Sequence, residues 1–189
     1  YRADAGSVRF EGREIAGVPA HRIARSGIAR TYQIPRPFAH LTVRDNVALT
    51  AMFGGERLAP DDARRAADEW LAFTGLSGRA DALPGDLNLH QTKFLELARS
   101  LASRPRLVLL DEVLSGLTPG EIDEAVELIR RIRARGTTIV LVEHVMRVVT
   151  ALSDRIVVLD QGRVLAQGPA AEVMARRDVA IAYLGTAHA

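Results

Sequence analysis

Two adjacent carboxylates end an apolar run in the middle of the chain. Residues 107–110 (LVLL) are followed directly by Asp111 and Glu112. Two acidic groups side by side repel each other. A bound cation or a role in acid–base chemistry would explain why they are adjacent. A carboxylate pair at the end of a strand can hold Mg²⁺ and act as a base on an attacking water. The alternative is a structural accident, two solvated loop residues without chemistry.

Two more polar residues follow segments that we expect to be extended. His144 comes after a second segment expected to be a buried strand, residues 137–142, and a histidine there can donate a hydrogen bond to a phosphate oxygen. Gln33 ends the stretch "IARTYQ", and its amide could reach a metal-bound water. Taken alone, His144 is more often a structural histidine, and Gln33 is more often an ordinary loop residue.

The stretch "LNLHQ", residues 87–91, is expected to open a helix. The free N–H groups and the dipole of a helix N-terminus favour anions, but an ordinary helix start capped by Asn88 explains the same residues. The stretch "TPGE", beginning at Thr118, has the pattern of a capping box with proline at the first helical position. For Thr118 we favour this structural explanation.

Periodicity and breakers predict the elements that would position these residues. Residues 7–15 and 155–168 are expected to be strand–turn–strand units, and residues 107–110 and 137–142 to be fully buried strands. Helices are expected between Pro19 and Gly27, from Thr42 to Gly54, over residues 62–74, 91–103 and 121–135, and in the tail up to "AYLG" at 182–185. Buried strands that alternate with amphipathic helices indicate an α/β fold. Residues 40–100, in contrast, are rich in helix without a strand and are expected to form an inserted helical subdomain.

The composition narrows the class of protein. The 189 residues are 48% apolar and 25% charged with a net charge of +2, enough for one large domain and a charged surface. The absence of cysteine excludes disulfides and cysteine-based zinc sites. Nearly all basic residues are arginine, without the clustering on one face that nucleic-acid binding requires. No apolar run approaches the roughly 18 residues of a membrane helix.

The order and spacing of these features resemble the ATP-binding subunit of an ABC transporter over essentially the whole chain. "LNLHQTKFLELARSLASRPRLVLLDE" resembles the signature helix running into the Walker B strand, "SGLT" (residues 115–118) the D-loop, and "IVVLDQGRVLAQGPAAEV" the closing hairpin and helix. "GIARTYQ", "LTVRDNV", "VEHVM" and "AYLG" look most like the branched-chain amino-acid import ATPases. The resemblance implies a P-loop NTPase-like core, residues 1–40 and 100–189, with a helical signature subdomain at residues 41–99.

The resemblance also implies a role for each site residue. Asp111 would hold the Mg²⁺ shell, and Glu112 would polarise the attacking water. His144 would contact the γ-phosphate of ATP. Gln33 would sense the metal and couple to the membrane subunit.

The remaining residues would act between two subunits. Ser115 would touch the opposite subunit of a head-to-tail dimer. The signature residues would cap ATP bound by that partner; these are Leu87, Asn88, Leu89, His90 and Gln91.

Two departures from the family pattern stand out. No G-x-x-x-x-G-K-[ST] motif occurs, and the only lysine, Lys93, is followed by Phe94. The resemblance places the P-loop just upstream of Tyr1, so we expect an N-terminally truncated chain that does not hydrolyse ATP alone. In the signature, Asn88, Leu89 and His90 replace the usual Ser-Gly-Gly, and the larger side chains are expected to project toward the phosphate.

The resulting expectation is an ATPase subunit that couples ATP hydrolysis to import of branched-chain amino acids. It would work with permease subunits and a second ATPase subunit, peripherally on the cytoplasmic face of the inner membrane, without nucleic acid. The alternatives are an export ATPase of the same subgroup, such as one for lipopolysaccharide, a degenerate non-hydrolysing ABC domain, and a soluble ABC-type ATPase acting on nucleic acid.

Overall fold

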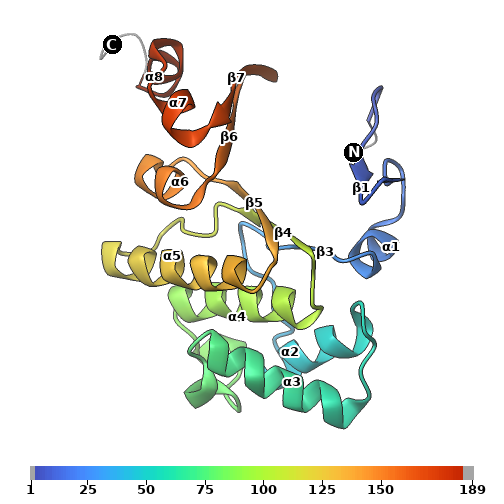
Figure 1. The fold of residues 1–189 in the computed structure, drawn as a ribbon. Helices are drawn as coiled ribbons and strands as arrows, with labels where there is room; N and C mark the ends of the chain where they lie inside the picture. The colour runs from blue at the N-terminus through green and yellow to red at the C-terminus, as the bar shows by residue number, and fades with distance from the viewer. Residues whose placement is uncertain (1–2, 185–189) are drawn as a thin grey trace.

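The computed structural model describes residues 3–184, in which helices and strands alternate (Figure 1). The strands are β1 (Arg9–Phe10), β2 (Arg13–Glu14), β3 (Ile28–Arg30), β4 (Leu107–Asp111), β5 (Thr138–Val142), β6 (Arg155–Asp160) and β7 (Arg163–Pro169). The helices are α1 (Ala20–Arg25), α2 (Val43–Phe53), α3 (Pro60–Phe73), α4 (Leu89–Ala102), α5 (Pro119–Ala134), α6 (Met146–Leu152), α7 (Ala170–Met174) and α8 (Arg177–Leu184), with two 3₁₀ turns, η1 (Ser77–Arg79) and η2 (Pro84–Asp86).

The central sheet is parallel and has the strand order β3-β4-β5. Val108 of β4 is paired with Ala29 of β3 on one side and with Ile139 of β5 on the other. Parallel strands need a crossover, and α5 provides the one from β4 to β5. The predicted α/β fold class is therefore confirmed, with β4 as the middle strand.

Strand β5 is half exposed rather than fully buried. Val140 is 48% and Val142 58% exposed, whereas Ile139 and Leu141 pack against the core. The strand lies at the edge of the three-stranded sheet, and its side chains alternate between the core and solvent. The prediction of a fully buried strand at residues 137–142 was wrong, because an unbroken apolar run does not reveal whether both faces are covered.

One hydrophobic core joins the sheet to the helices. It takes its buried side chains from α2, α3, α4, β4, α5 and α6. Figure 1 shows α4 and α5 beneath the sheet, with α2 and α3 beyond α4. Helix α4 is thus enclosed by its neighbours, and its buried residues run almost without interruption from Lys93 to Ala102. As predicted, the described chain between residues 40 and 100 contains helices and no strand.

Two antiparallel hairpins flank the core. β1 pairs with β2 and β6 pairs with β7, as the turn residues predicted. Behind β6 and β7 a small second cluster holds Ala166, Val173 and Val179, which fixes α7 and α8 to that hairpin. The helical tail is confirmed as far as Leu184, and Gly185 lies outside the described residues.

Helix α2 begins with a hydrogen-bonded cap that also binds α3. Thr42 accepts a hydrogen bond from the Asp45 N–H at 3.1 Å, and its hydroxyl donates to the Asp45 carboxylate at 2.8 Å. Arg64 of α3 donates to the same carboxylate at 3.1 Å. The Thr42 hydroxyl and then Arg64 hold the pKa of Asp45 below its ordinary value, against the opposing effect of burial.

Asp45→Asn is expected to destabilise the protein in a pH-dependent way. A depressed folded pKa means that the carboxylate stabilises the fold above the ordinary value of 3.8 and loses that effect as the pH falls through the folded pKa. Urea unfolding at pH 7 should show a loss of roughly 0.5–1 kcal/mol, because the pair is partly exposed. The gap to the wild type should begin to narrow near pH 3.8 and should close as the pH falls through the lower folded pKa of Asp45. Glu69→Gln, on the exposed side of α3, is the control, and a gap that persists in acid would contradict the assignment.

Candidate functional site

The carboxyl ends of the three parallel strands bring three predicted residues together. Gln33 lies beyond β3, Glu112 directly after β4, and His144 beyond β5. The Gln33 side-chain N–H donates to Glu112 Oε2 at 2.5 Å. The His144 Nδ1 lies 3.7 Å from Glu112 Oε1. Ligand sites of open α/β sheets occur at this edge, and Glu112 is in the middle of the cluster.

The backbone of Glu112 adopts an unusual conformation. Its φ is +44°, a left-handed value that costs a residue with a side chain on the order of 1–2 kcal/mol. Hydrogen bonds hold it there: its N–H donates to the Val142 carbonyl at 3.0 Å, and its carbonyl accepts from the Ser115 N–H at 3.1 Å. The tight turn after β4 thus aims the carboxylate across the sheet edge, between Gln33 and His144.

Asp111 faces a different partner from Glu112. Its carboxylate is paired with Arg30 Nη2 at 3.0 Å and is about one third exposed. Within residues 3–184 no group of three or more histidine, cysteine or acidic residues is close enough to enclose a metal. The protein ligands expected for Mg²⁺ would be the Asp111 carboxylate, which is paired with Arg30 here, and the amide oxygen of Gln33. Such a donor set would fit the ion, which commonly takes one or two protein oxygens and fills its shell with water and phosphate.

The signature residues form a capped helix start. Asn88 Oδ1 accepts from the Gln91 N–H at 2.8 Å, and Gln91 Oε1 accepts from the Asn88 N–H at 3.2 Å. The predicted cap is thus confirmed as a reciprocal capping box at the start of α4. Leu89 is 48% exposed and lies beside Gly116, where an added Cβ would meet its Cδ2 at 3.0 Å.

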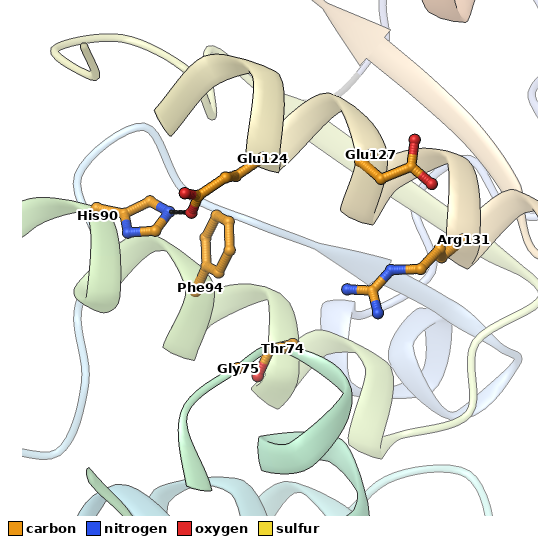
Figure 2. A pocket seen from close by; sticks show the side chains of 7 residues that line it. All are labelled: Thr74, Gly75, His90, Phe94, Glu124, Glu127 and Arg131. Atoms are coloured by element: carbon orange, nitrogen blue, oxygen red, sulfur yellow. Dashed lines mark ion pairs between the residues drawn. The ribbon is translucent and has the colours of Figure 1, made fainter. Parts of the chain in front are cut away.

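His90 turns away from the helix N-terminus. Its ring packs on Phe94 with centroids 4.1 Å apart, and its Nε2 lies 3.5 Å from the carboxylate of Glu124 in α5. Figure 2 shows this pair at one end of a cavity of about 350 Å³ between α4, α5 and the turn at Gly75. In this structure the His90 ring thus lies against the next turn of α4 and faces the acid on α5. Its expected approach to a phosphate stays a prediction.

The D-loop residues lie between β4 and α5. Ser115 is exposed, as a contact with another subunit would require. Thr118 accepts from the Glu121 N–H at 3.4 Å, and its own N–H donates to the Glu121 carboxylate at 2.8 Å. The bond from the Thr118 N–H, and a second bond from the Thr118 hydroxyl to the same carboxylate at 2.8 Å, hold the pKa of Glu121 below its ordinary value. The capping box predicted for Thr118 is confirmed.

Sequence reasoning missed the groups that support the loop after Gln33. Asn46 of α2 is fully buried, donates to the carbonyls of Phe38, Leu41 and Thr42, and accepts from the Phe38 N–H at 2.8 Å. Helix α4 supports the same loop, because its Glu96 carboxylate accepts a hydrogen bond from the Arg36 N–H at 3.1 Å. Arg99 donates to the Arg36 carbonyl, also at 3.1 Å. The only signal in the sequence was an asparagine on the apolar face of a helix.

Comparison with known proteins agrees with this geometry. The family model described as "ABC transporter" matches residues 1–115. The chain belongs to the ABC transporter ATPase family. The high-affinity branched-chain amino acid transport ATP-binding protein BraF of Pseudomonas aeruginosa is 36% identical over 201 residues, which cover 99% of this chain and 79% of BraF. LivG of Escherichia coli, with the same description, is 35% identical with the same coverage.

Solved structures of ATP-binding cassettes share the fold. The ADP conformation of MJ1267, an ATP-binding cassette of an ABC transporter, is similar with a TM-score of 0.84 and 26% identity, over 98% of this chain and 79% of that one. A nucleotide-free cassette gives a TM-score of 0.83 at 25% identity, over 98% of this chain and 79% of that one. This chain is thus an ABC ATP-binding subunit with the cassette fold. Among residues 3–184, no helix is both long and apolar enough to cross a membrane.

Asn46→Ala is expected to cost about 2 kcal/mol of unfolding free energy, because it strands buried backbone groups of the loop after Gln33. Urea denaturation measures the loss. Asn88→Ala, which removes an exposed helix cap, is the matched control and should cost about 1 kcal/mol. Equal losses in the two variants would contradict the role assigned to Asn46.

Proposed function

We propose that this chain is the ATP-binding subunit of an importer for branched-chain amino acids. The observation that carries the proposal is the Gln33–Glu112–His144 cluster at the carboxyl edge of a parallel sheet. The names of BraF and LivG, both branched-chain amino acid transport proteins, support the choice of substrate. The partners are permease subunits, at the cytoplasmic face of the inner membrane, and a second ATPase subunit.

Each residue of the cluster has a proposed task. The Glu112 carboxylate accepts a hydrogen bond from the water that attacks the γ-phosphate. This bond orients the water. His144 donates to the γ-phosphate oxygen, and Gln33 would connect the Glu112 carboxylate, to which its side-chain N–H donates, with the Mg²⁺ site. Asp111 holds the Mg²⁺ shell, and the ion offsets phosphate charge when it is bound. Hydrolysis of this kind rests on positioning and electrostatic stabilisation.

The signature residues are proposed to act on the nucleotide of the second subunit. The capped N-terminus of α4, with Asn88 and Gln91, favours an anion by its dipole. Since His90 packs against α5, Leu89 is the side chain that restricts how closely the nucleotide can approach the N-terminus of α4. Ser115 meets the other subunit. In this division residues 41–99 form the signature subdomain and residues 1–40 and 100–189 the core, with α4 running across the boundary.

Two alternatives remain within the family. Export by a lipopolysaccharide-type system would use the same ATPase chemistry, and a gene for a periplasmic binding protein beside this one would favour import. A non-hydrolysing domain is favoured by the altered signature "LNLHQ". ATP hydrolysis by a form of the protein that can dimerise would exclude the non-hydrolysing domain and support our proposal.

Glu112→Gln tests the hydrolytic role in a version of the chain extended at its N-terminus by a P-loop segment typical of the family. ATPase activity measured by phosphate release should fall about 100-fold or more, because the amide cannot take over acid–base work on water. Binding of ATP should be retained. Glu127→Gln on α5 is the matched control and should keep full activity. An extended wild-type dimer without any activity would overturn the enzyme proposal.

The 189-residue chain by itself is expected to bind ATP poorly and not to hydrolyse it. Its sequence contains no G-x-x-x-x-G-K-[ST] motif to surround the phosphates with N–H groups and a lysine. Calorimetric titration with Mg²⁺ and ATP measures the affinity. A micromolar dissociation constant would contradict this expectation.

A further inference from the structure

The only lysine of the chain is buried inside the core. Lys93 lies on α4 and is 4% exposed. A buried ammonium is costly unless it is paired or hydrogen-bonded. Burial lowers the pKa of Lys93, and the charges of Glu143 and Glu112 act in the opposite direction. The contacts of the Lys93 ammonium must therefore compensate for the cost of its burial.

The ammonium of Lys93 lies against the turn that follows β4. Its Nζ donates to the backbone carbonyl of Glu112 at 3.4 Å. Glu143, whose charge also acts on Lys93, accepts from the Leu114 N–H at 3.1 Å through Oε1. The Oε2 of Glu143 is buried and has no hydrogen-bond partner among the described residues. Lys93 and Glu143 therefore hold the turn at two successive points behind Glu112.

We propose that Lys93 is a positioning residue for Glu112. Its ammonium fixes the Glu112 carbonyl, and with it the left-handed backbone that aims the carboxylate toward Gln33 and His144. The effect is indirect, since Lys93 reaches the peptide group and not the reacting atoms. The inference rests on the proposed hydrolytic role of Glu112 and adds the device that orients it.

The same helix also holds the other side of the cluster. Glu96 and Arg99 follow Lys93 at intervals of three residues, so the three side chains share one face of α4. Glu96 and Arg99 bind the backbone of Arg36, in the loop after Gln33. One charged face of α4 thus fixes the backbone behind Glu112 and the backbone beyond Gln33.

Amide hydrogen exchange of the chain as it is, without nucleotide, tests the contact. In Lys93→Met the amides of Glu112, Leu114 and Ser115 should exchange about tenfold faster, the loss expected for a hydrogen bond from a charged donor. Lys93→Arg should restore part of the protection, because the guanidinium is also a donor. Leu95→Val is the control on another face of α4 and should leave these amides unchanged. Equal exchange in Lys93→Met and wild type, or an increase spread evenly over α4 and β4, would overturn the proposal.

Steady-state kinetics of the P-loop-extended protein give the second measurement. Lys93→Met should lower kcat about tenfold at an unchanged KM for ATP, and Lys93→Arg should recover part of kcat. An unchanged kcat, or a loss confined to KM, would count against a positioning role. If the extended wild type is inactive, the proposed function fails, while the exchange experiment still decides whether Lys93 holds the turn.

Discussion

The parallel pairing of β4 with both β3 and β5 is the constraint on which the candidate site depends. Three strands that run in one direction end at one edge, so Gln33, Glu112 and His144 meet although more than a hundred residues separate the first from the last. The pairing also supplies the Val142 carbonyl that accepts the Glu112 N–H. Without the β4–β5 register, neither the cluster nor the strained turn would have its partners.

The helices follow from that sheet. Helix α5 is the crossover from β4 to β5, and its first residues are capped by Thr118 at the end of the D-loop. Helix α4 fills the space between α5 and the pair α2–α3, which explains why so much of it is buried. Charged residues on a buried helix must find partners, and those of α4 find them in the backbone of the two loops that border the site.

The sequence predicted the α/β class and most of the elements, because strand ends, caps and breakers are local signals. Gln33, Glu112 and His144 were singled out together only by the resemblance to the family, and the structure brings their side chains into contact. The sequence did not predict features that depend on tertiary packing, such as which face of a strand is covered by other elements. Residues 139–142 are all apolar, yet only the packing shows that the side chains of Val140 and Val142 are exposed. The contacts of the His90 ring with Phe94 and with the carboxylate of Glu124 on another helix likewise become visible only in the structure. Asn46 supports the loop that directly precedes its own helix, and Lys93 supports a turn in a different element. Both act through side chain–backbone hydrogen bonds, which no hydrophobic periodicity encodes.

Helix α4 has a mechanical consequence. Its capped start at Asn88 and its contact with Glu112 at Lys93 are five residues apart, or about 7.5 Å along the axis. A helix is stiff over so short a length, and this one is packed on several sides, so we expect the segment to move as a rigid body. A displacement of its N-terminus would therefore move Lys93, and with it the hydrogen bond to the peptide group of Glu112.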